Sequence, residues 1–204
     1  MSTQLIPSNY IKSTGRLPSH ITHKQYLQLR ELPYKIYSKK ELPNKRNDFL
    51  IIRDKLLIDM CWETGGRIGD ITKIVVDRDI DFNDKILSLR VSKSKITIQI
   101  NLSQEMCYDI LQFKTKYADK EPFAMTRTNA WYLINKYGDE IGIKLHPHMF
   151  RHGLALFLLS KNVPIPIISY RLGHANTKIT MDLYMKVTPD IENQFMQEIE
   201  FRGD

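Results

Sequence analysis

The sequence predicts an α+β fold that is mainly helical and carries one small three-stranded antiparallel sheet. Apolar residues recur at helical spacing along most of the chain, and the period changes to alternation only between Val75 and Leu102. The 204 residues are enough for one domain of about 150 residues with tails. No run of about 20 apolar residues is present, so no membrane-spanning helix is expected.

The N-terminal residues 1–21 are expected to form a flexible arm, because they are rich in Ser, Thr, Pro and Gly and lack apolar periodicity. Thr22 is the expected N-cap of a first helix, which Pro33 should end. Further helices are predicted at about Arg46 to Glu63, Asp70 to Ile74, Ser103 to Tyr117, Asn129 to Ile141, His148 to Lys161, Pro164 to Leu172, Thr177 to Met185 and 188–204. The second helix should end at Thr64-Gly65-Gly66, since glycine readily adopts the backbone conformation of a helix terminus.

Three short segments alternate apolar and polar residues, as strands with one buried face do. They are Ile80 to Phe82, Lys85 to Val91 and Lys95 to Leu102, and turn residues separate them at Asn83-Asp84 and at Ser92 to Ser94. The pattern predicts a small antiparallel sheet between the second helix and the helices that follow.

Charge and cysteine content indicate the surroundings of the protein. Lys and Arg number 30 against 23 Asp and Glu, and the net charge of +7 favours a polyanionic partner such as DNA. Cys61 and Cys107 each lie in an apolar stretch and are expected to be buried free thiols, as in a reducing compartment. The N-terminus lacks the basic and apolar regions of a secretory signal, so a cytoplasmic protein without membrane contact is expected.

A calcium-binding loop is suggested by three carboxylates at alternating positions, Asp77, Asp79 and Asp81. Counted from Asp77, however, Phe82 stands at the sixth position, where the loop needs Gly, and Ser88 at the twelfth, where it needs Glu. The sequence therefore argues against calcium.

Other metal and cofactor chemistries also lack their motifs. His148 and His152 have the spacing of zinc ligands, but Met149 stands where a zinc hydrolase needs its Glu base. Neither a phosphate-binding glycine loop nor a G-x-S-x-G elbow occurs, so no metal or cofactor is expected. The Arg, Lys, His and Tyr residues that remain suit metal-free attack on a phosphodiester. Arginines stabilise the charged transition state, a Lys or His protonates the leaving oxygen, and a Tyr among cations is the nucleophile.

Ordered boxes along the chain resemble those of the tyrosine recombinase (phage integrase) family. Residues 64–71 (TGGRIGDI) are similar to its T-G-x-R-x-x-E-L, and residues 146–152 (HPHMFRH) to its H-x-L-R-H. Residues 172–174 (LGH), followed ten residues later by Tyr184, resemble its L-G-H and terminal tyrosine. The chain departs from the family by an Asp in the first box, a Phe for Leu in the second, and one extra residue before Tyr184.

The resemblance implies a role for each matched residue. Tyr184 would be the nucleophile, and Asp70 would orient neighbouring cations. Lys93 is the expected lysine of the hairpin turn, in preference to Lys95. The catalytic set implied in this way is Arg67, Lys93, His148, Arg151, His174 and Tyr184. His152 would give packing support, and Tyr170 is expected in the core.

The family's reaction implies cleavage of double-stranded DNA at a specific site, through a 3′-phosphotyrosyl link and a free 5′-hydroxyl, without metal or ATP. Residues 22–187 would be the catalytic domain, and the helix at 188–204 could pack on a neighbouring protomer in a homo-tetramer on DNA. Without DNA, a monomer or weak oligomer is expected. The family's usual core-binding domain is missing from this sequence, which fits either a short recombinase or an excised domain of prokaryotic or mobile-element origin.

Three alternatives stay open at this point. A type IB topoisomerase uses nearly the same phosphate chemistry, and a catalytically silent DNA-binding relative would keep the boxes without the reaction. A different basic binding module would require the boxes to be coincidental.

Overall fold

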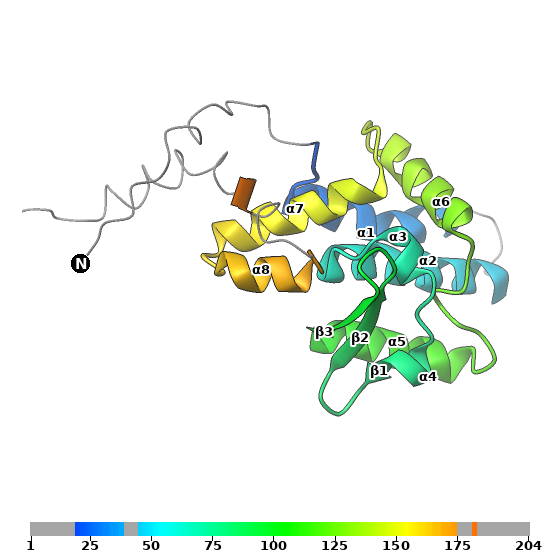
Figure 1. Ribbon diagram of the computed structural model, residues 1–204. Coiled ribbons are helices and arrows are strands. Elements are labelled where there is room, and N and C mark those ends of the chain that lie inside the picture. Colours follow the sequence, from blue (N-terminus) through cyan, green and yellow to red (C-terminus); the bar gives the residue numbers. More distant parts are fainter. Residues whose placement is uncertain (1–18, 39–44, 175–180, 183–204) are drawn as a thin grey trace, which may run out of the picture.

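The computed structural model describes residues 19–38, 45–174 and 181–182 and has the predicted α+β fold (Figure 1). Its helices are α1 (His23–Tyr37), α2 (Lys45–Thr64), α3 (Ile68–Ile71), α4 (Val76–Asp79), α5 (Gln104–Lys116), α6 (Arg127–Glu140), α7 (Pro147–Ser160) and α8 (Ile165–Arg171). Its strands are β1 (Ile80–Asp81), β2 (Ile86–Val91) and β3 (Ile96–Asn101). Met181 and Asp182 are helical, but the rest of the two predicted C-terminal helices and the arm before Ser19 lie outside the described residues.

Helix α2 is the centre of the fold. It packs against α1, α5, α6 and α7, and its seven consecutive residues 56–62 are all buried. A helix surrounded by protein needs apolar residues on every side, and Asp59 is tolerated among them because it is fully paired. Its carboxylate accepts from the hydroxyl of Tyr26 at 2.9 Å and pairs with Arg30 and Lys55.

Helix α1 begins where the sequence predicted but ends later. Thr22 forms a capping box with Gln25, whereas Pro33 lies inside the helix, which runs on to Tyr37. Proline inside a helix removes the hydrogen bond to the carbonyl four residues earlier, and its ring crowds that carbonyl. The turn after it is held by packing, because Tyr37 is buried and its hydroxyl donates to buried Asp54. Tertiary contacts therefore outweigh the helix-breaking tendency of Pro33.

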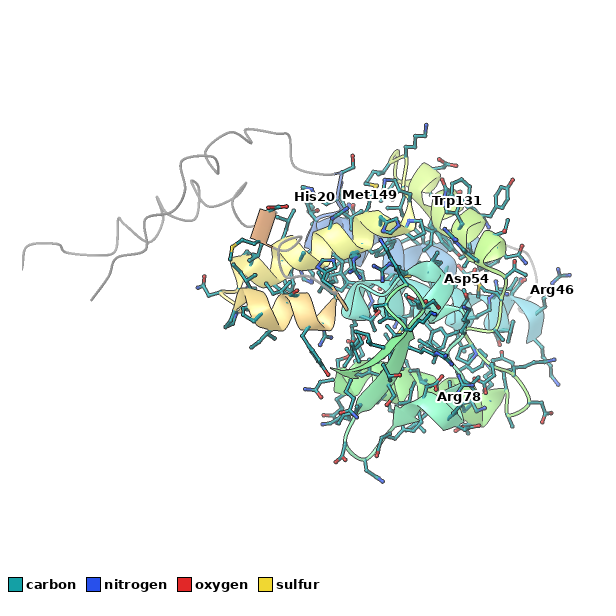
Figure 2. All side chains as sticks on the ribbon, viewed as in Figure 1. His20, Arg46, Asp54, Arg78, Trp131 and Met149 are labelled. Atoms are coloured by element: carbon teal, nitrogen blue, oxygen red, sulfur yellow. The ribbon has the colours of Figure 1, made fainter. Side chains whose placement is uncertain are left out.

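The chain before α1 already belongs to the core. Ile21, which the sequence placed at the end of the arm, is fully buried, and its N–H donates to the carbonyl of Met149 at 3.3 Å. Figure 2 labels His20, the residue before Ile21, and Met149 beside α7. A side chain at Gly153 would place its Cβ 2.2 Å from the Ile21 carbonyl oxygen, so glycine allows this close contact.

The sheet has the order β1-β2-β3 and is antiparallel, as predicted. Leu87, Leu89 and Val91 of β2 and Ile98 and Ile100 of β3 point into the core, in step with the sequence alternation.

Two short helices differ from the prediction. Helix α3 starts two residues earlier than expected and ends three earlier, and α4 was not predicted, because single helical turns carry too few residues to show a period. Cys61 and Cys107 are buried free thiols, as predicted. None of the helices in the described part of the chain is long and apolar enough to cross a bilayer.

Candidate active site

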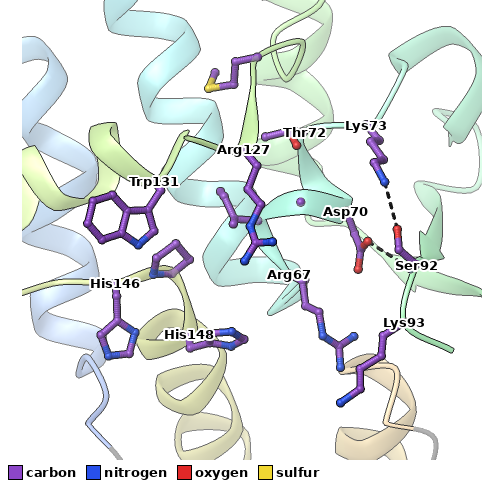
Figure 3. A pocket seen from close by; sticks show the side chains of 15 residues that line it. Arg67, Asp70, Thr72, Lys73, Ser92, Lys93, Arg127, Trp131, His146 and His148 are labelled. Carbon is purple, nitrogen blue, oxygen red and sulfur yellow. Dashed lines mark hydrogen bonds between the residues drawn. The ribbon is translucent and has the colours of Figure 1, made fainter. Parts of the chain in front are cut away.

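A pocket of about 740 Å³ lies between α3, the β2–β3 turn and the N-terminal ends of α6 and α7 (Figure 3). Its polar and aromatic lining consists of Arg67, Asp70, Thr72, Lys73, Ser92, Lys93, Arg127, Trp131, His146 and His148. Arg67, Lys93 and His148 of the predicted set therefore come together here from segments far apart in the sequence. Arg151 and His174 interact with the charge of Arg67 from beside the pocket, and Tyr184 lies outside the described residues.

The position of Arg67 is set by the glycines that end α2. Gly65 has φ +57°, and a Cβ there would lie 2.5 Å from Cδ2 of Leu172 and 3.0 Å from Cδ2 of Leu154. The end of α2 thus meets α7 and α8 at a point where only glycine fits. Thr64 closes the turn, because its Oγ1 donates to the Met60 carbonyl at 2.7 Å and accepts from the Gly66 N–H at 2.9 Å.

Arg151 is held inside the fold beside this turn. Its Nη1 donates to the carbonyl oxygen of Gly65 at 2.9 Å, while its Nη2 is buried and has no hydrogen-bond partner among the described residues. Burial and, after it, the charge of Arg67 lower the pKa of Arg151 to about 10, against an opposing effect of the Asp70 charge. A buried guanidinium nitrogen without a partner is costly, and an anion from outside would satisfy it.

The positive charges of these arginines act on two histidines. Partial burial and the charges of Arg151, His146 and Arg67 lower the pKa of His148. Burial and the charges of Arg151 and Arg67 lower the pKa of His174 to about 4. Both rings are therefore neutral at pH 7, and each can donate one N–H to a phosphate oxygen.

The L-G-H segment forms the end of α8. The N–H of Gly173 donates to the Tyr170 carbonyl at 2.8 Å and that of His174 to the Ser169 carbonyl at 3.0 Å, which is a Schellman motif. Gly173 supplies the left-handed conformation, with φ +61°, and its missing side chain allows contact with Val91 of the sheet. The motif fixes the backbone from which His174 leaves the helix.

The sequence placed Tyr170 in the core, and this prediction is wrong. Tyr170 is 55% exposed, and its hydroxyl accepts the N–H of Gln99 at 3.2 Å. It lies over the outer edge of β3, where the strand offers backbone groups that have no partner strand within the described part of the chain. An apolar helix pattern does not reveal this use of a tyrosine.

Asp70 holds the turn that carries Lys93. Its buried carboxylate accepts the N–H of Ser92 at 3.1 Å, and Lys73 donates to the Ser92 hydroxyl at 3.2 Å (Figure 3). Lys93 consequently lines the pocket with Arg67. Lys95, the other candidate, has φ +57° and lines an adjoining hollow with Arg78 and Arg90 instead of the pocket itself.

The sequence did not single out Lys73, Arg127 or Trp131 as pocket residues. Arg127 and Trp131 lie four residues apart on one face of α6. The predicted helix began at Asn129, so Arg127 seemed to lie in a loop. The N-cap signal that could have placed it is Thr126, whose side chain accepts the N–H of Asn129. Among the described residues, no group of three or more His, Cys, Asp or Glu could hold a metal ion.

A match to a known protein family covers most of the chain. The sequence model of the phage integrase family matches residues 22–190. The chain belongs to the phage integrase family. The resemblance seen in the three boxes is therefore confirmed at the level of the family.

Curated relatives and solved structures also match much of the chain. The tyrosine recombinase XerA of Pyrococcus horikoshii is 30% identical over 148 residues, which are 67% of this chain and 51% of the relative. A crystal structure of XerA recombinase matches with a TM-score of 0.70 and 16% identity, over 98% of this chain and 68% of that one. The structure of the Tn1549 transposon integrase in complex with a circular intermediate DNA matches with a TM-score of 0.63 and 16% identity. The match covers 96% of this chain and 70% of that one. The chain spans about half the length of the curated relatives it matches.

Proposed function

We propose that this protein is a site-specific DNA recombinase that cleaves and rejoins DNA strands through a 3′-phosphotyrosyl intermediate at Tyr184. The proposal rests on the cationic site that this member of the phage integrase family contains. Arg67 and Arg151 meet at the turn that ends α2, and Nη2 of Arg151 has no partner among the described residues. A phosphodiester is the anion that such a site fits best.

Each residue has a part in the proposed reaction. The tyrosine loses its proton to solvent, its Oη forms a bond to phosphorus, and the bond from phosphorus to the 5′-oxygen breaks. Lys93 donates the proton that this 5′-oxygen takes up. Arg67 and Arg151 stabilise the negative charge that is added to the nonbridging oxygens in the transition state. The number of phosphoester bonds stays the same, so a 5′-hydroxyl can reverse the step. His148 and His174 donate hydrogen bonds to the same phosphate, and no metal or ATP takes part.

We also propose a partner, a division into domains, an assembly and a cellular compartment for this protein. We propose double-stranded DNA with a specific recombination site as the partner, supported by the net charge of +7 and by a related fold that was solved with DNA. Residues 22–187 and the buried Ile21 would act as the catalytic domain, with the residues before Ile21 as an arm and 188–204 as a helix that contacts a neighbouring protomer. A homo-tetramer on DNA, in the cytoplasm, completes the proposal.

A nicked suicide duplex tests the reaction, because loss of the short strand traps the covalent adduct. The wild-type chain should give a protein–DNA adduct that survives denaturing electrophoresis, and Tyr184→Phe should give none. Tyr170→Phe is the matched control, since this exposed tyrosine near His174 has only a structural bond. The absence of an adduct on every duplex, including the ends of the element that encodes the protein, would sink the proposal. Relaxation of supercoiled DNA that lacks a recombination site would favour a topoisomerase instead.

A further inference from the structure

The last turn of α8 carries an arginine whose hydrogen bonds within the described residues all go to the backbone. Arg171 is partly buried, and its Nε and Nη2 donate to the carbonyl oxygen of Glu63 at 2.9 and 2.7 Å. Nη2 also donates to the carbonyl oxygen of Asn101 at 3.2 Å. The carboxylate of Glu63 is engaged elsewhere, with the N–H and hydroxyl of Ser103. The guanidinium therefore binds the chain itself rather than a side chain.

The two carbonyls lie at the ends of elements that border the site. Glu63 is in the last turn of α2, four residues before Arg67, and Asn101 ends β3. Carbonyls in the last turn of a helix have no partner within the helix, and a charged donor binds them about twice as strongly as a neutral one. Arg171 thus ties α8 to α2 and to β3 at one point.

A second arginine holds the same turn from another helix. Arg151 of α7 donates to the carbonyl of Gly65, two residues after the carbonyl that Arg171 binds. Both α7 and α8 are therefore fastened to the segment that leads to Arg67. His174 leaves the Schellman motif three residues after Arg171, so the same bonds fix where it stands relative to this segment.

We infer that Arg171 is a positioning residue, which sets His174 against Arg67 and Arg151 without contacting the phosphate. The inference rests on the proposed function for the role of His174 in strand cleavage. Without Arg171, the carbonyls of Glu63 and Asn101 lose a charged donor and the end of α8 can shift against α2. A displacement of about 1 Å in a catalytic group can cost about 10²-fold in rate.

A double-mutant cycle with His174 separates positioning from general destabilisation. Single-turnover adduct formation on the suicide duplex would be measured for Arg171→Ala, His174→Ala and the double variant, together with duplex affinity and thermal midpoint. We expect Arg171→Ala to slow adduct formation by about 10²-fold with little loss of affinity, and to add little in the His174→Ala background. Arg171→Lys should recover part of the rate, since its ammonium can replace the bonds of Nη2 but not the second bond that Nε gives to the Glu63 carbonyl.

Arg53→Ala is the matched control for a lost, partly buried arginine. Arg53 pairs with Asp54 on α2, away from the pocket, so this variant should lower the thermal midpoint and leave the rate unchanged. An unchanged rate in Arg171→Ala, or rate losses that multiply with those of His174→Ala, would overturn the inference. If Arg171→Ala does not fold, Arg171→Lys enters the same cycle.

A readout that is independent of cleavage keeps the two proposals apart. The imidazole of His174 can be titrated by NMR in the intact chain, with His174→Ala to assign its signal. In Arg171→Ala its pKa should rise from about 4 towards the ordinary value of 6.5, because the ring becomes less buried and moves away from the two guanidinium groups. An unchanged pKa would overturn the positioning role, whereas a wild-type chain that forms no adduct would overturn the proposed reaction.

Discussion

His174 shows how the site acts on a single side chain. Burial of its imidazole, together with the charges of Arg151 and Arg67, lowers its pKa to about 4. The pKa values of His148 and His152 are lowered in the same direction, with burial as the largest cause. The free site therefore holds its histidines neutral, and an entering phosphate would favour their protonated forms.

This arrangement makes the stability of the free protein depend on pH. Between about pH 6.5 and pH 4 an unfolded histidine binds a proton that the folded His174 does not bind. The free energy of unfolding should therefore fall as the pH falls through this window. Thermal midpoints measured at pH 7.5, 6.0 and 5.0 should decrease, and the decrease should be shallower in His174→Gln. Equal slopes for the two proteins would contradict the assigned pKa.

Gly173 illustrates a residue that the backbone requires. An alanine would have to adopt φ +61° and would place its Cβ 2.9 Å from Cγ2 of Val91. Gly173→Ala should lower the free energy of unfolding by about 1–3 kcal/mol, as left-handed backbone does for other residues, and urea denaturation would measure it. Gly69→Ala is the control, because its Cβ would make only an ordinary contact of 3.5 Å with Arg127. Equal losses in both variants would show that the conformation at Gly173 is not the cause.

At the scale of the elements, the sequence predicted what local patterns encode. The helix stop at Gly65, the cap at Thr22 and the alternation in β2 and β3 each depend on neighbouring residues. The continuation of α1 through Pro33 depends on Tyr37 meeting Asp54, and the exposure of Tyr170 depends on the outer edge of β3. Such contacts join distant segments, so no local pattern reveals them.

The candidate site divides in the same way. The boxes identified Arg67, His148, Arg151 and His174 by resemblance, and their spacing needed no tertiary information. The sequence could not show that Asp70 reaches across to the N–H of Ser92, or that Arg171 binds backbone carbonyls. Supporting interactions of this kind have no fixed spacing along the chain.

The hairpin of β2 and β3 depends on one carboxylate for its placement. Asp70→Ala would remove the acceptor of the Ser92 N–H and release the turn that carries Lys93. Exchange of the Ser92 amide should accelerate, and adduct formation should slow by up to about 10²-fold, the lower range for a lost general acid. Hydrogen exchange and the suicide duplex measure the two effects.

The matched control for this change lies in the other turn of the sheet. Asp81 accepts the N–H groups of Asn83 and Asp84 between β1 and β2, away from the pocket. Asp81→Ala should loosen that turn and leave adduct formation unchanged. If both substitutions slow the reaction equally, Asp70 has no special part in placing Lys93.

For the whole molecule, the excess of positive charge should govern DNA affinity. Each phosphate that a cation neutralises releases counterions, so affinity falls with salt in proportion to the number of contacts. Replacing Arg67 by Gln should reduce the slope of log K against log salt by about 1. Binding titrations of one duplex between low and physiological salt would measure this. Arg46→Gln, at the start of α2 and away from the pocket (Figure 2), should leave the slope unchanged. An unaltered slope in Arg67→Gln would mean that Arg67 does not neutralise a phosphate.

The unsatisfied nitrogen of Arg151 has a consequence for the energetics of the free protein. A fold optimised only for its own stability would place an apolar side chain there or a carboxylate beside it. Keeping a buried guanidinium whose Nη2 has no partner among the described residues makes the free chain less stable than its architecture allows. An anion that binds Nη2 would remove this cost, so part of its binding free energy would appear as added stability of the folded state.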